Sequence, residues 1–338
     1  MLDQQAQMRL VPELLRIAVR AGAAIREVYA HGRFETEQKA DDSPLTVADR
    51  RAHAIIDAGL TALSAHIPIL SEEGTHLPYS ERRHWDELWL VDPLDGTKEF
   101  IKHTDDFTVN IALVQHQEPV LGVIYAPVTG ETWVGLAAPR AYDAAPGDSG
   151  RGGPAPPAAS SAREGLEPRA GAGGGGSDPA GGRPPAANRA WKLSIQDESD
   201  VHQTFELDRE AQEIRVRARP ADPATADVTI MVSKSHMNEE TAAALEQAEA
   251  AFGRVRTTNI GSSLKLCKVA EGSVDLYPRN APTSEWDTAA GHAIVRAAGG
   301  EIWQAGPEVE AQTHPLVYNK PDLLNPWFLV RAWQAPDG

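Results

Sequence analysis

Hydrophobic residues repeat at helical spacing in two stretches near the beginning of the chain. The first stretch is predicted to form an amphipathic helix with one face made of Leu10, Leu14, Ile17, Ala21, Ile25 and Val28. The second forms a similar face from Ala52, Ile55, Ile56, Leu60 and Leu63. A polar loop, residues 41–46, separates them. Thr46 and Asp49 have the spacing of a capping box, so Asp49 taken alone is best interpreted as a helix-start carboxylate.

Two short hydrophobic runs follow, and acidic residues end each of them. The run 67–70 leads into Ser71-Glu72-Glu73-Gly74, and the run 89–91 leads into Asp92. Each run is predicted to be a buried strand. We expect Asp92 to end the second strand, because Pro93 cannot donate to a ladder of hydrogen bonds. If the two strands are neighbours in one sheet, their acidic ends meet.

The second of these strands opens the stretch that carries most of the candidate chemistry, W-L-V-D-P-L-D-G-T-K-E-F at 89–100. Asp95 and Gly96 are predicted to form a turn, and Thr97 begins a helical turn. The N–H groups of Gly96 and Thr97 should then point into the space beside the carboxylates of Asp92 and Asp95. Carboxylates bind hard cations and a helix N-terminus attracts phosphate, so the stretch suggests metal-assisted phosphate chemistry. A single D-P-x-D-G is more often a solvated turn, so this interpretation depends on the rest of the chain.

After residue 107 the pattern changes to β structure and then loses all periodicity. Runs at 107–115, 120–125 and 131–136, separated by turn residues, predict an antiparallel meander. Residues 144–190 fit no pattern. Between 151 and 190 there are 10 Gly, 10 Ala and 7 Pro, and Leu166 is the only large aliphatic residue. Such a segment cannot bury enough surface to offset its ordering entropy, so we predict a disordered insertion.

Strands and helices alternate in the last part of the chain, which favours an α/β domain. The predicted strands are 228–232, 254–257, 274–277 and 327–331, and the predicted helices are 238–252, one that contains Leu264, Cys267 and Val269, and one from Glu285 to the stop signal Gly299-Gly300. Three parts result: an α+β domain at 1–143, the insertion at 144–190 and an α/β domain at 191–338. Cys267 is interpreted as a small core residue.

Length and charge narrow the class of protein. The 338 residues can form two domains with a sizeable core, and a net charge of −16 argues against non-specific binding to nucleic acid. The single cysteine excludes an intrachain disulfide and fits a reducing compartment. We see no signal peptide and no apolar run of the roughly 18 residues that a membrane span needs, so a cytoplasmic protein is expected.

Four motifs, in order along the chain, resemble those of the inositol monophosphatase superfamily: S-P-L-T-V-A-D at 43–49, L-S-E-E at 70–73, W-L-V-D-P-L-D-G-T-K-E-F at 89–100 and W-D-T-A-A-G at 286–291. G-S-S-L-K at 261–265 and L-Y-P-R at 276–279 are similar to its bacterial 3'(2'),5'-bisphosphate nucleotidase branch. The resemblance covers nearly the whole chain apart from the insertion. It implies a layered αβαβα sandwich of the inositol monophosphatase and fructose-1,6-bisphosphatase type, an α/β fold with an α+β half, an α/β half and the site between them.

The resemblance also implies roles for individual residues. Those that match the family's magnesium ligands are Glu72, Asp92, Asp95, Asp287 and the backbone carbonyl of Leu94. Glu73 matches a catalytic position that supports the metal shell, and Asp49 and Thr97 match the pair that orients and deprotonates the attacking water. The N–H groups of Gly96 and Thr97 match a phosphate cradle. Glu72, Leu94, Asp95 and Asp287 are expected to contact the substrate as well.

A second group of residues is predicted to hold the rest of the substrate. Ser262, Lys265 and Arg279, together with His236, are the candidates for binding the ribose and the 5'-phosphate or base. Basic side chains and free N–H groups favour an anion. A single basic residue is more often a solvated surface charge, so the position of these residues in the nucleotidase-like motifs decides the interpretation.

The expected function is removal of the 3'-phosphate of adenosine 3',5'-bisphosphate, and of 3'-phosphoadenylyl sulfate, with two or three Mg²⁺ ions. Oxygen ligands without a His/Cys cluster suit Mg²⁺ better than Zn²⁺. The alternatives are an inositol or sugar monophosphatase and a non-catalytic phosphonucleotide-binding protein, which should have lost a ligand or the water-activating pair. A small phosphorylated nucleotide is the expected partner. The resemblance also allows peripheral association with the cytoplasmic face of the inner membrane, and the oligomeric state stays open.

Overall fold

Helices and strands alternate along a chain whose computed structural model describes residues 1–32, 36–38, 44–140, 188–202, 205–218, 220–232, 239–305 and 314–333. The elements before residue 140 are α1 (Gln4–His31), β1 (Thr36–Gln38), β2 (Pro44–Thr46), α2 (Val47–Leu63), β3 (Ile69–Ser71), α3 (Tyr79–Arg82), β4 (Glu87–Asp95), α4 (Thr97–Ile101), β5 (Thr108–Gln115), β6 (Glu118–Tyr125) and β7 (Glu131–Ala137). Those after residue 187 are β8 (Asn188–Ser194), η1 (Glu198–Asp200), α5 (Leu207–Glu210), β9 (Gln212–Ile214), η2 (Pro223–Thr225), β10 (Asp227–Val232), α6 (Glu239–Ala251), β11 (Arg254–Asn259), α7 (Leu264–Ala270), β12 (Leu276–Arg279), α8 (Glu285–Ala298), β13 (Glu301–Gln304) and β14 (Phe328–Arg331).

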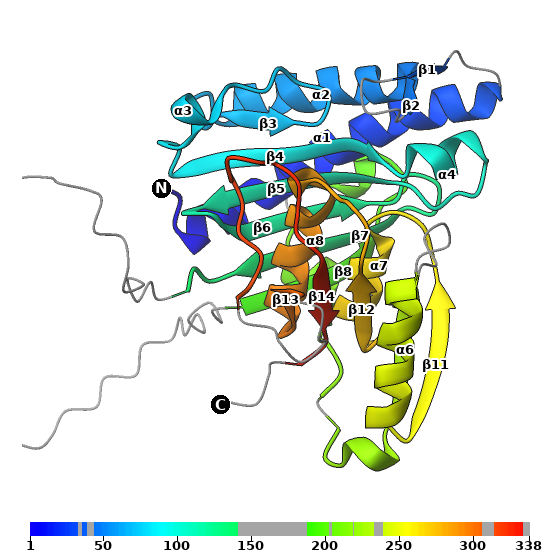
Figure 1. Ribbon diagram of the computed structural model, residues 1–338. Helices are drawn as coiled ribbons and strands as arrows, with labels where there is room; N and C mark the ends of the chain where they lie inside the picture. The colour runs from blue at the N-terminus through cyan, green and yellow to red at the C-terminus, as the bar shows by residue number, and fades with distance from the viewer. Residues whose placement is uncertain are drawn as a thin grey trace, which may run out of the picture. The chain divides into compact units, whose positions relative to one another are not determined.

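The two predicted N-terminal helices are confirmed as α1 and α2, which pack on each other and on one face of the larger sheet (Figure 1). Asp3 caps the start of α1, and Gly32 ends it in the left-handed conformation. The predicted capping box is present in α2, where the Thr46 side chain accepts from the backbone and Asp49 accepts from Thr46 N at 2.8 Å. Local side-chain chemistry therefore fixes where α2 begins.

The larger sheet has seven strands in the order β3-β4-β5-β6-β7-β8-β9. β3 and β4 are parallel, and β5, β6 and β7 form the predicted antiparallel meander. β8 and β9 extend the same sheet, so the chain beyond the predicted insertion first completes the N-terminal sheet. β8 begins at Asn188, within the range predicted for the insertion, and Asn188 pairs with Ala137. Residues 141–187 lie outside the described residues, so the predicted disorder and the two-domain division remain predictions.

Helix α8 lies directly on the other face of the seven-stranded sheet. A Cβ atom on Gly122 of β6 would lie 2.2 Å from the Ala290 carbonyl oxygen, and one on Gly135 of β7 would lie 2.4 Å from Ile294 Cα. Gly122 and Gly135 are cross-strand partners, so they form a flat patch against which the α8 backbone packs. This close approach fixes the height of α8, and with it the position of Asp287, above the sheet.

The second sheet, of five strands in the order β11-β10-β12-β14-β13, packs on the far side of α7 and α8 (Figure 1). Helices α1 and α2, the first sheet, α7 and α8, the second sheet and α6 give the predicted αβαβα layering. Strand β12 extends beyond its predicted end at Tyr277 through Pro278 to Arg279. Pro278 is tolerated because β12 pairs with β10 only at Leu276, so no bond to β10 is lost.

Strand β4 connects the two hydrophobic cores on either side of the first sheet. Trp89 and Val91 face the core under α1 and α2, whereas Leu88 and Leu90 face the core under α8. Because both faces are covered, the strand is a continuous hydrophobic run without polar alternation. Among the residues that the structure describes, none of the helices is both long enough and apolar enough to span a bilayer.

Candidate active site

The acidic ends of two neighbouring strands meet at one edge of the first sheet. β3 and β4 are paired in parallel, with Ser71 opposite Val91, and Glu72 N donates to Val91 O at 3.0 Å. Glu72, the residue after β3, therefore lies beside Asp92 on the neighbouring strand β4. The condition under which the two acidic ends meet, that these strands are neighbours in one sheet, is therefore fulfilled.

The prediction that Asp92 ends its strand is wrong, because β4 continues through Pro93 to Asp95. Asp92 pairs with Asn110 and Asp95 with Thr108, so β4 contains one extra residue in this interval. A bulge leaves that residue outside the ladder, which is how a strand accepts a proline. Leu94 N donates to Asp92 Oδ1 at 3.0 Å across the bulge. The bulge thus directs two carboxylates, Asp92 and Asp95, from one strand.

Asp95 is held by the segment that precedes α7. Its Oδ2 accepts from Ser263 N and Ser263 Oγ, both at 2.5 Å, and lies 3.4 Å from Asn110 Nδ2. Asn110 Nδ2 also donates to Ser263 Oγ at 2.9 Å, and Ser263 Oγ lies 2.8 Å from the Asp287 carbonyl oxygen. Ser263 therefore connects β4, β5 and α8 at the site.

Gly96, which follows Asp95, has no space for a side chain. Its φ is 92°, and an added Cβ would lie 2.9 Å from the Asp106 carbonyl oxygen and 3.2 Å from Ser262 Cβ. The turn that begins α4 therefore packs closely against the Gly261–Ser263 segment. This contact brings the loop after β4 and the loop before α7 to the same pocket.

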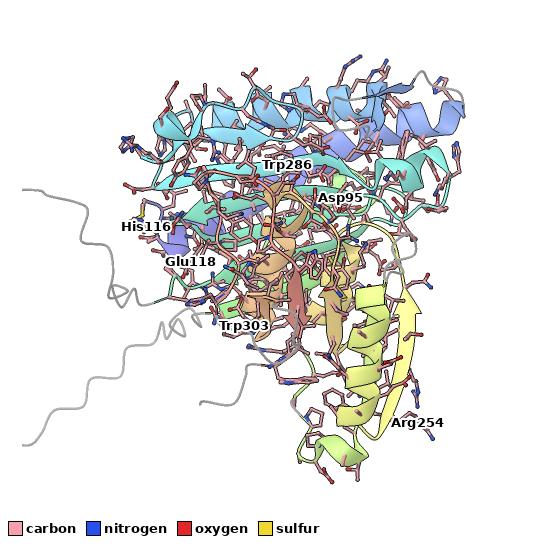
Figure 2. The ribbon with its side chains drawn as sticks, in the orientation of Figure 1. Asp95, His116, Glu118, Arg254, Trp286 and Trp303 are labelled. Carbon is pink, nitrogen blue, oxygen red and sulfur yellow. The ribbon has the colours of Figure 1, made fainter. Side chains whose placement is uncertain are left out.

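Asp287 enters the site from the first turn of α8. Its Oδ2 accepts from Ser284 N at 2.8 Å, so the side chain caps its own helix. The preceding residue, Trp286, contacts the ring of His76 with a centroid separation of 5.0 Å. Asp95 and Trp286, labelled in Figure 2, mark the end of β4 and the start of α8. The His76–Trp286 contact ties the loop after Glu72 to the helix that carries Asp287.

Glu72, Asp92, Asp95 and Asp287, which we call the carboxylate cluster, repel one another. Burial raises the pKa of Asp92 well above its usual range, and the charges of Glu72, Asp95 and Asp287 raise it further. Burial and the charges of Asp95 and Glu72 also raise the pKa of Asp287. A hydrogen bond between Asp92 and Glu72 contributes to the shift, so a nearby cation would favour the ionised form of Asp92.

The cluster has the chemistry of a site for a hard cation. Within the described part of the chain, no three His, Cys, Asp or Glu side chains form a ready-made group that could hold a metal ion. The donor set is nevertheless all oxygen, and its like charges are stabilised by a divalent cation better than by a single proton. The residues therefore fit Mg²⁺ by donor type and by charge.

Asp49 and Thr97 lie side by side, as the sequence predicts. The distance between Thr97 Oγ1 and Asp49 Oδ1 is 3.4 Å, and Thr97 Oγ1 also donates to the Leu94 carbonyl at 3.2 Å. The pKa of Asp49 is raised to about 6, chiefly by burial. The charges of Glu73 and Glu72 add to the rise, and the hydrogen bonds from Thr46 oppose it. Asp49 thus uses Oδ2 to cap α2 and presents Oδ1 to Thr97.

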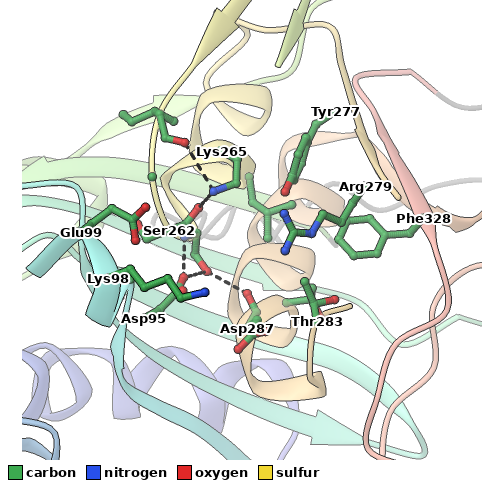
Figure 3. A pocket seen from close by; sticks show the side chains of 16 residues that line it. Asp95, Lys98, Glu99, Ser262, Lys265, Tyr277, Arg279, Thr283, Asp287 and Phe328 are labelled. Carbon is green, nitrogen blue, oxygen red and sulfur yellow. Dashed lines mark hydrogen bonds between the residues drawn. The ribbon is translucent and has the colours of Figure 1, made fainter. Parts of the chain in front are cut away.

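A basic side of the pocket faces the carboxylate cluster (Figure 3). Ser262, Lys265 and Arg279, which we call the cationic wall, line it together with Tyr277 and Phe328. Lys265 Nζ donates to the Ser262 carbonyl at 2.7 Å and lies 5.9 Å from the centroid of the Tyr277 ring. Burial lowers the pKa of Lys265 to about 8. Arg279 Nη2 donates to the Pro282 carbonyl at 3.2 Å.

The model of the inositol monophosphatase family matches residues 9–144 and 195–334, which is most of the chain and includes every site residue described above. The chain belongs to the inositol monophosphatase family. Members of this family are generally metal-dependent, in keeping with the carboxylate cluster.

Curated members of the family from enterobacteria align with the chain over nearly its full length. The protein named 3'(2'),5'-bisphosphate nucleotidase CysQ of Escherichia coli strain K12 is 37% identical over 329 residues, covering 96% of this chain and 100% of that protein. The CysQ of Salmonella typhimurium is 39% identical with the same coverage. The crystal structure of CysQ from Bacteroides thetaiotaomicron matches with a TM-score of 0.68 and 36% identity, covering 97% of this chain and 98% of that one.

A more distant family member supports the fold alone. The inositol monophosphatase of Thermotoga maritima matches with a TM-score of 0.56 at 19% identity. The predicted αβαβα fold of the inositol monophosphatase type is therefore confirmed. The roles of individual residues come from motifs and geometry, so they remain proposals.

Several residues of the site were not predicted from the sequence, and one predicted residue lies outside the described part of the chain. Ser263 and Asn110 hold Asp95, and Lys98 and Glu99 line the pocket. The signal for Asn110 was a polar side chain within a hydrophobic strand, and the signal for Ser263 was its place in G-S-S-L-K. His236, predicted to contact the substrate, lies outside the described residues, as does Ser43 of the first motif.

Proposed function

We propose that this family member is a Mg²⁺-dependent 3'(2'),5'-bisphosphate nucleotidase that hydrolyses the 3'-phosphate of adenosine 3',5'-bisphosphate to give AMP and phosphate. The activity extends to 3'-phosphoadenylyl sulfate. The observation that carries the proposal is the pairing, in one pocket, of two carboxylates of the cluster, Asp95 and Asp287, with the cationic wall. A substrate with two separated anionic groups matches these two ends. The names of the CysQ relatives support the same substrate class.

The carboxylate cluster is the proposed metal site, with two or three Mg²⁺ ions. Glu72, Asp92, Asp95, Asp287 and the Leu94 carbonyl are the proposed ligands, and Glu73 supports them. Bound Mg²⁺ supplies neutralisation of phosphate charge and activation of water. The phosphate that is hydrolysed would then be surrounded by Glu72, Leu94, Asp95 and Asp287. The N–H groups of Gly96 and Thr97 would face it.

Asp49 and Thr97 are the proposed water-activating pair. The Thr97 hydroxyl orients the attacking water and relays its proton toward Asp49 Oδ1, 3.4 Å away. With a pKa of about 6, Asp49 is mostly ionised at neutral pH and remains basic enough to accept that proton. The hydrogen bonds from Thr46 hold the carboxylate in place while it does so.

The cationic wall is proposed to hold the ribose and the 5'-phosphate or base. Arg279 offers a planar fork suited to phosphate, and Lys265 adds a charge beside the Ser262 segment. His236, from outside the described residues, remains a proposed member of this group. In a protein with a net charge of −16, two cations at one pocket favour the entry of an anionic substrate.

Phosphate release from a substrate panel tests the function. The panel contains adenosine 3',5'-bisphosphate, 3'-AMP and inositol 1-phosphate, each with Mg²⁺ and with EDTA. We expect the bisphosphate to have the highest kcat/KM and all release to stop in EDTA. A preference for inositol 1-phosphate would show an inositol phosphatase instead. Binding of the bisphosphate without any turnover would show a non-catalytic binding protein.

A further inference from the structure

Three basic side chains line the described pocket, and two of them are committed to protein contacts. Lys265 Nζ donates to the carbonyl oxygens of Ser262 and Ile260 at 2.7 and 3.5 Å. Arg279 Nη2 donates to the Pro282 carbonyl at 3.2 Å. These contacts fix both cations on one side of the pocket. The third cation, Lys98, lies on the opposite side.

Lys98 differs from the other two in its surroundings. It is the second residue of α4, directly after Thr97, and its side chain is exposed. Across the described part of the chain, no carboxylate lies within ion-pair distance of its ammonium group. Figure 3 shows the Lys98 side chain extending into the pocket from α4, while Arg279 enters from β12. Its charge is therefore available to a ligand.

The charge balance of the pocket indicates what this ligand must be. Asp95, Glu99 and Asp287 line the pocket and repel any anion that a cation does not meet. Under the proposed function, the carboxylate cluster would hold the metal and receive the phosphate that is hydrolysed. A second anionic group on the same substrate then has to lie elsewhere in the pocket, which Lys98 of α4 and Arg279 of β12 both line.

We propose that Lys98 binds the second anionic group of the substrate, opposite Arg279, and thereby selects bisphosphorylated over monophosphorylated nucleosides. The proposal rests on the proposed nucleotidase function. Arg279 presents a rigid fork with directional donors, whereas Lys98 presents a mobile point charge on a flexible stem. A lysine at this position accepts a phosphate or a phosphosulfate equally well, so one pocket serves both 5'-groups.

The test measures binding of AMP, which carries the second anion without the group that is hydrolysed. Isothermal titration calorimetry gives the Kd of AMP for the full chain and for Lys98→Gln, Lys98→Arg and Lys102→Gln. Lys102 lies at the other end of α4 and does not line the pocket, so it is the matched control. Losing one charged hydrogen bond should weaken AMP binding about tenfold or more in Lys98→Gln. Lys98→Arg and Lys102→Gln should stay close to wild type.

Two further ligands separate the role of Lys98 from its neighbours' roles. Inorganic phosphate with Mg²⁺ probes the site of the phosphate that leaves, and adenosine probes contacts to the nucleoside. The Kd of both should be unchanged in Lys98→Gln. In turnover, KM for adenosine 3',5'-bisphosphate should rise about tenfold, and kcat/KM for 3'-AMP should change little.

Several results would overturn the assignment. Unchanged AMP binding in Lys98→Gln would exclude contact with the second anion. An equal loss of affinity for inorganic phosphate, or an equal fall in kcat for both nucleotides, would place Lys98 on the phosphate that is hydrolysed. Failure of the nucleotidase proposal is visible separately, because wild type would then fail to hydrolyse the bisphosphate whatever the variants do.

Discussion

Asp95 and Asp287 of the carboxylate cluster share one pocket with the cationic wall, but different features of the fold position the cluster and the wall. The backbone positions the cluster, through the ends of two parallel strands, a bulge at Pro93 and the first turn of α8. Contacts between cationic side chains and backbone carbonyls place Lys265 and Arg279. Under the proposed function, the cluster would serve any phosphate monoester, whereas the wall would respond to what else the substrate carries. Changes in the cluster should abolish turnover, and changes in the wall should alter substrate preference.

The largest effect should come from Asp95→Asn. Loss of this charge removes several kcal/mol of metal-dependent stabilisation, which lowers kcat by about a thousandfold or more. The fold should survive, because Asp95 lies on a bulge at the pocket and outside both hydrophobic cores. Phosphate release at saturating Mg²⁺ measures the loss, with Asp86→Asn, an exposed carboxylate 76% accessible, as the control. A near-normal rate would contradict the metal assignment.

Thr97→Ala and Asp49→Asn should each lower kcat by about 10²- to 10⁴-fold and leave KM within a fewfold of wild type, because moving the proton of water matters only in the transition state. Asp49 also caps α2, so a matched variant is needed. Thr46→Ala removes one of the hydrogen bonds to Asp49 Oδ2 and leaves the Thr97 contact in place, so it should cost about 1 kcal/mol of stability and lower kcat much less than either site variant. If either site variant raised KM alone, the pair would be binding residues.

Substitutions in the cationic wall should change the ranking of substrates. Lys265→Ala and Arg279→Ala should each raise KM for adenosine 3',5'-bisphosphate by about ten- to a hundredfold, since each removes a charged hydrogen bond of about 1.5–3 kcal/mol. The effect on inositol 1-phosphate should be small. Arg254→Ala, an exposed arginine of β11, is the control. Equal losses on every substrate would show that the wall serves the cluster and does not select.

The pH dependence of AMP binding sharpens the same comparison. Burial lowers the pKa of Lys265 to about 8, so this side chain is charged below that pH and neutral above it. Without metal, AMP affinity should therefore fall as the pH rises through about 8, and the bound anion should shift the fall somewhat upward. Lys265→Arg keeps its charge throughout and should abolish the fall. An identical profile for wild type and Lys265→Arg would assign the titration to another group.

The smallest effect should come from deleting residues 150–186. This segment contains none of the residues that line the pocket, and Leu166 is its only large aliphatic residue. Ala137 and Asn188, the strand ends nearest the deletion, are cross-strand partners, so a short connection can join them. The melting temperature and kcat/KM should stay close to wild type. A loss of many degrees would show that the segment packs against the rest of the protein.

Sequence patterns predicted the parts of this fold that depend on local periodicity and capping. The amphipathic faces of α1 and α2 could be read directly, because burial on one side imposes a helical period, and the strands of the meander could be read as hydrophobic runs between turn residues. The pairing of β3 with β4 was raised only as a condition, because each run was followed by carboxylates. The continuation of β4 past Pro93 was missed, since a bulge depends on the partner strand β5 and not on the proline alone.

Contacts between residues far apart in the sequence limited how much of the site could be predicted. Ser263 and Asp95 are 168 residues apart in the sequence, and the motif that contains Ser263 gave no indication that its hydroxyl holds a carboxylate. The assignment of β8 and β9 to the first sheet also depends on pairing with β7, which the chain reaches only after the predicted insertion. Local pattern specifies elements, whereas the partners of polar side chains follow from tertiary packing.

The identity of the first product distinguishes the two sides of the pocket, because the 3'-phosphate is proposed to lie at the carboxylate cluster and the 5'-phosphate at the cationic wall. Adenosine 3',5'-bisphosphate is incubated with the protein and Mg²⁺, and the first-formed products are separated by ion-exchange chromatography and identified by phosphorus NMR. We expect AMP bearing the 5'-phosphate and one equivalent of inorganic phosphate, with no adenosine. Formation of 3'-AMP as the first product would place the 5'-phosphate at the carboxylate cluster and contradict the division between the two sides.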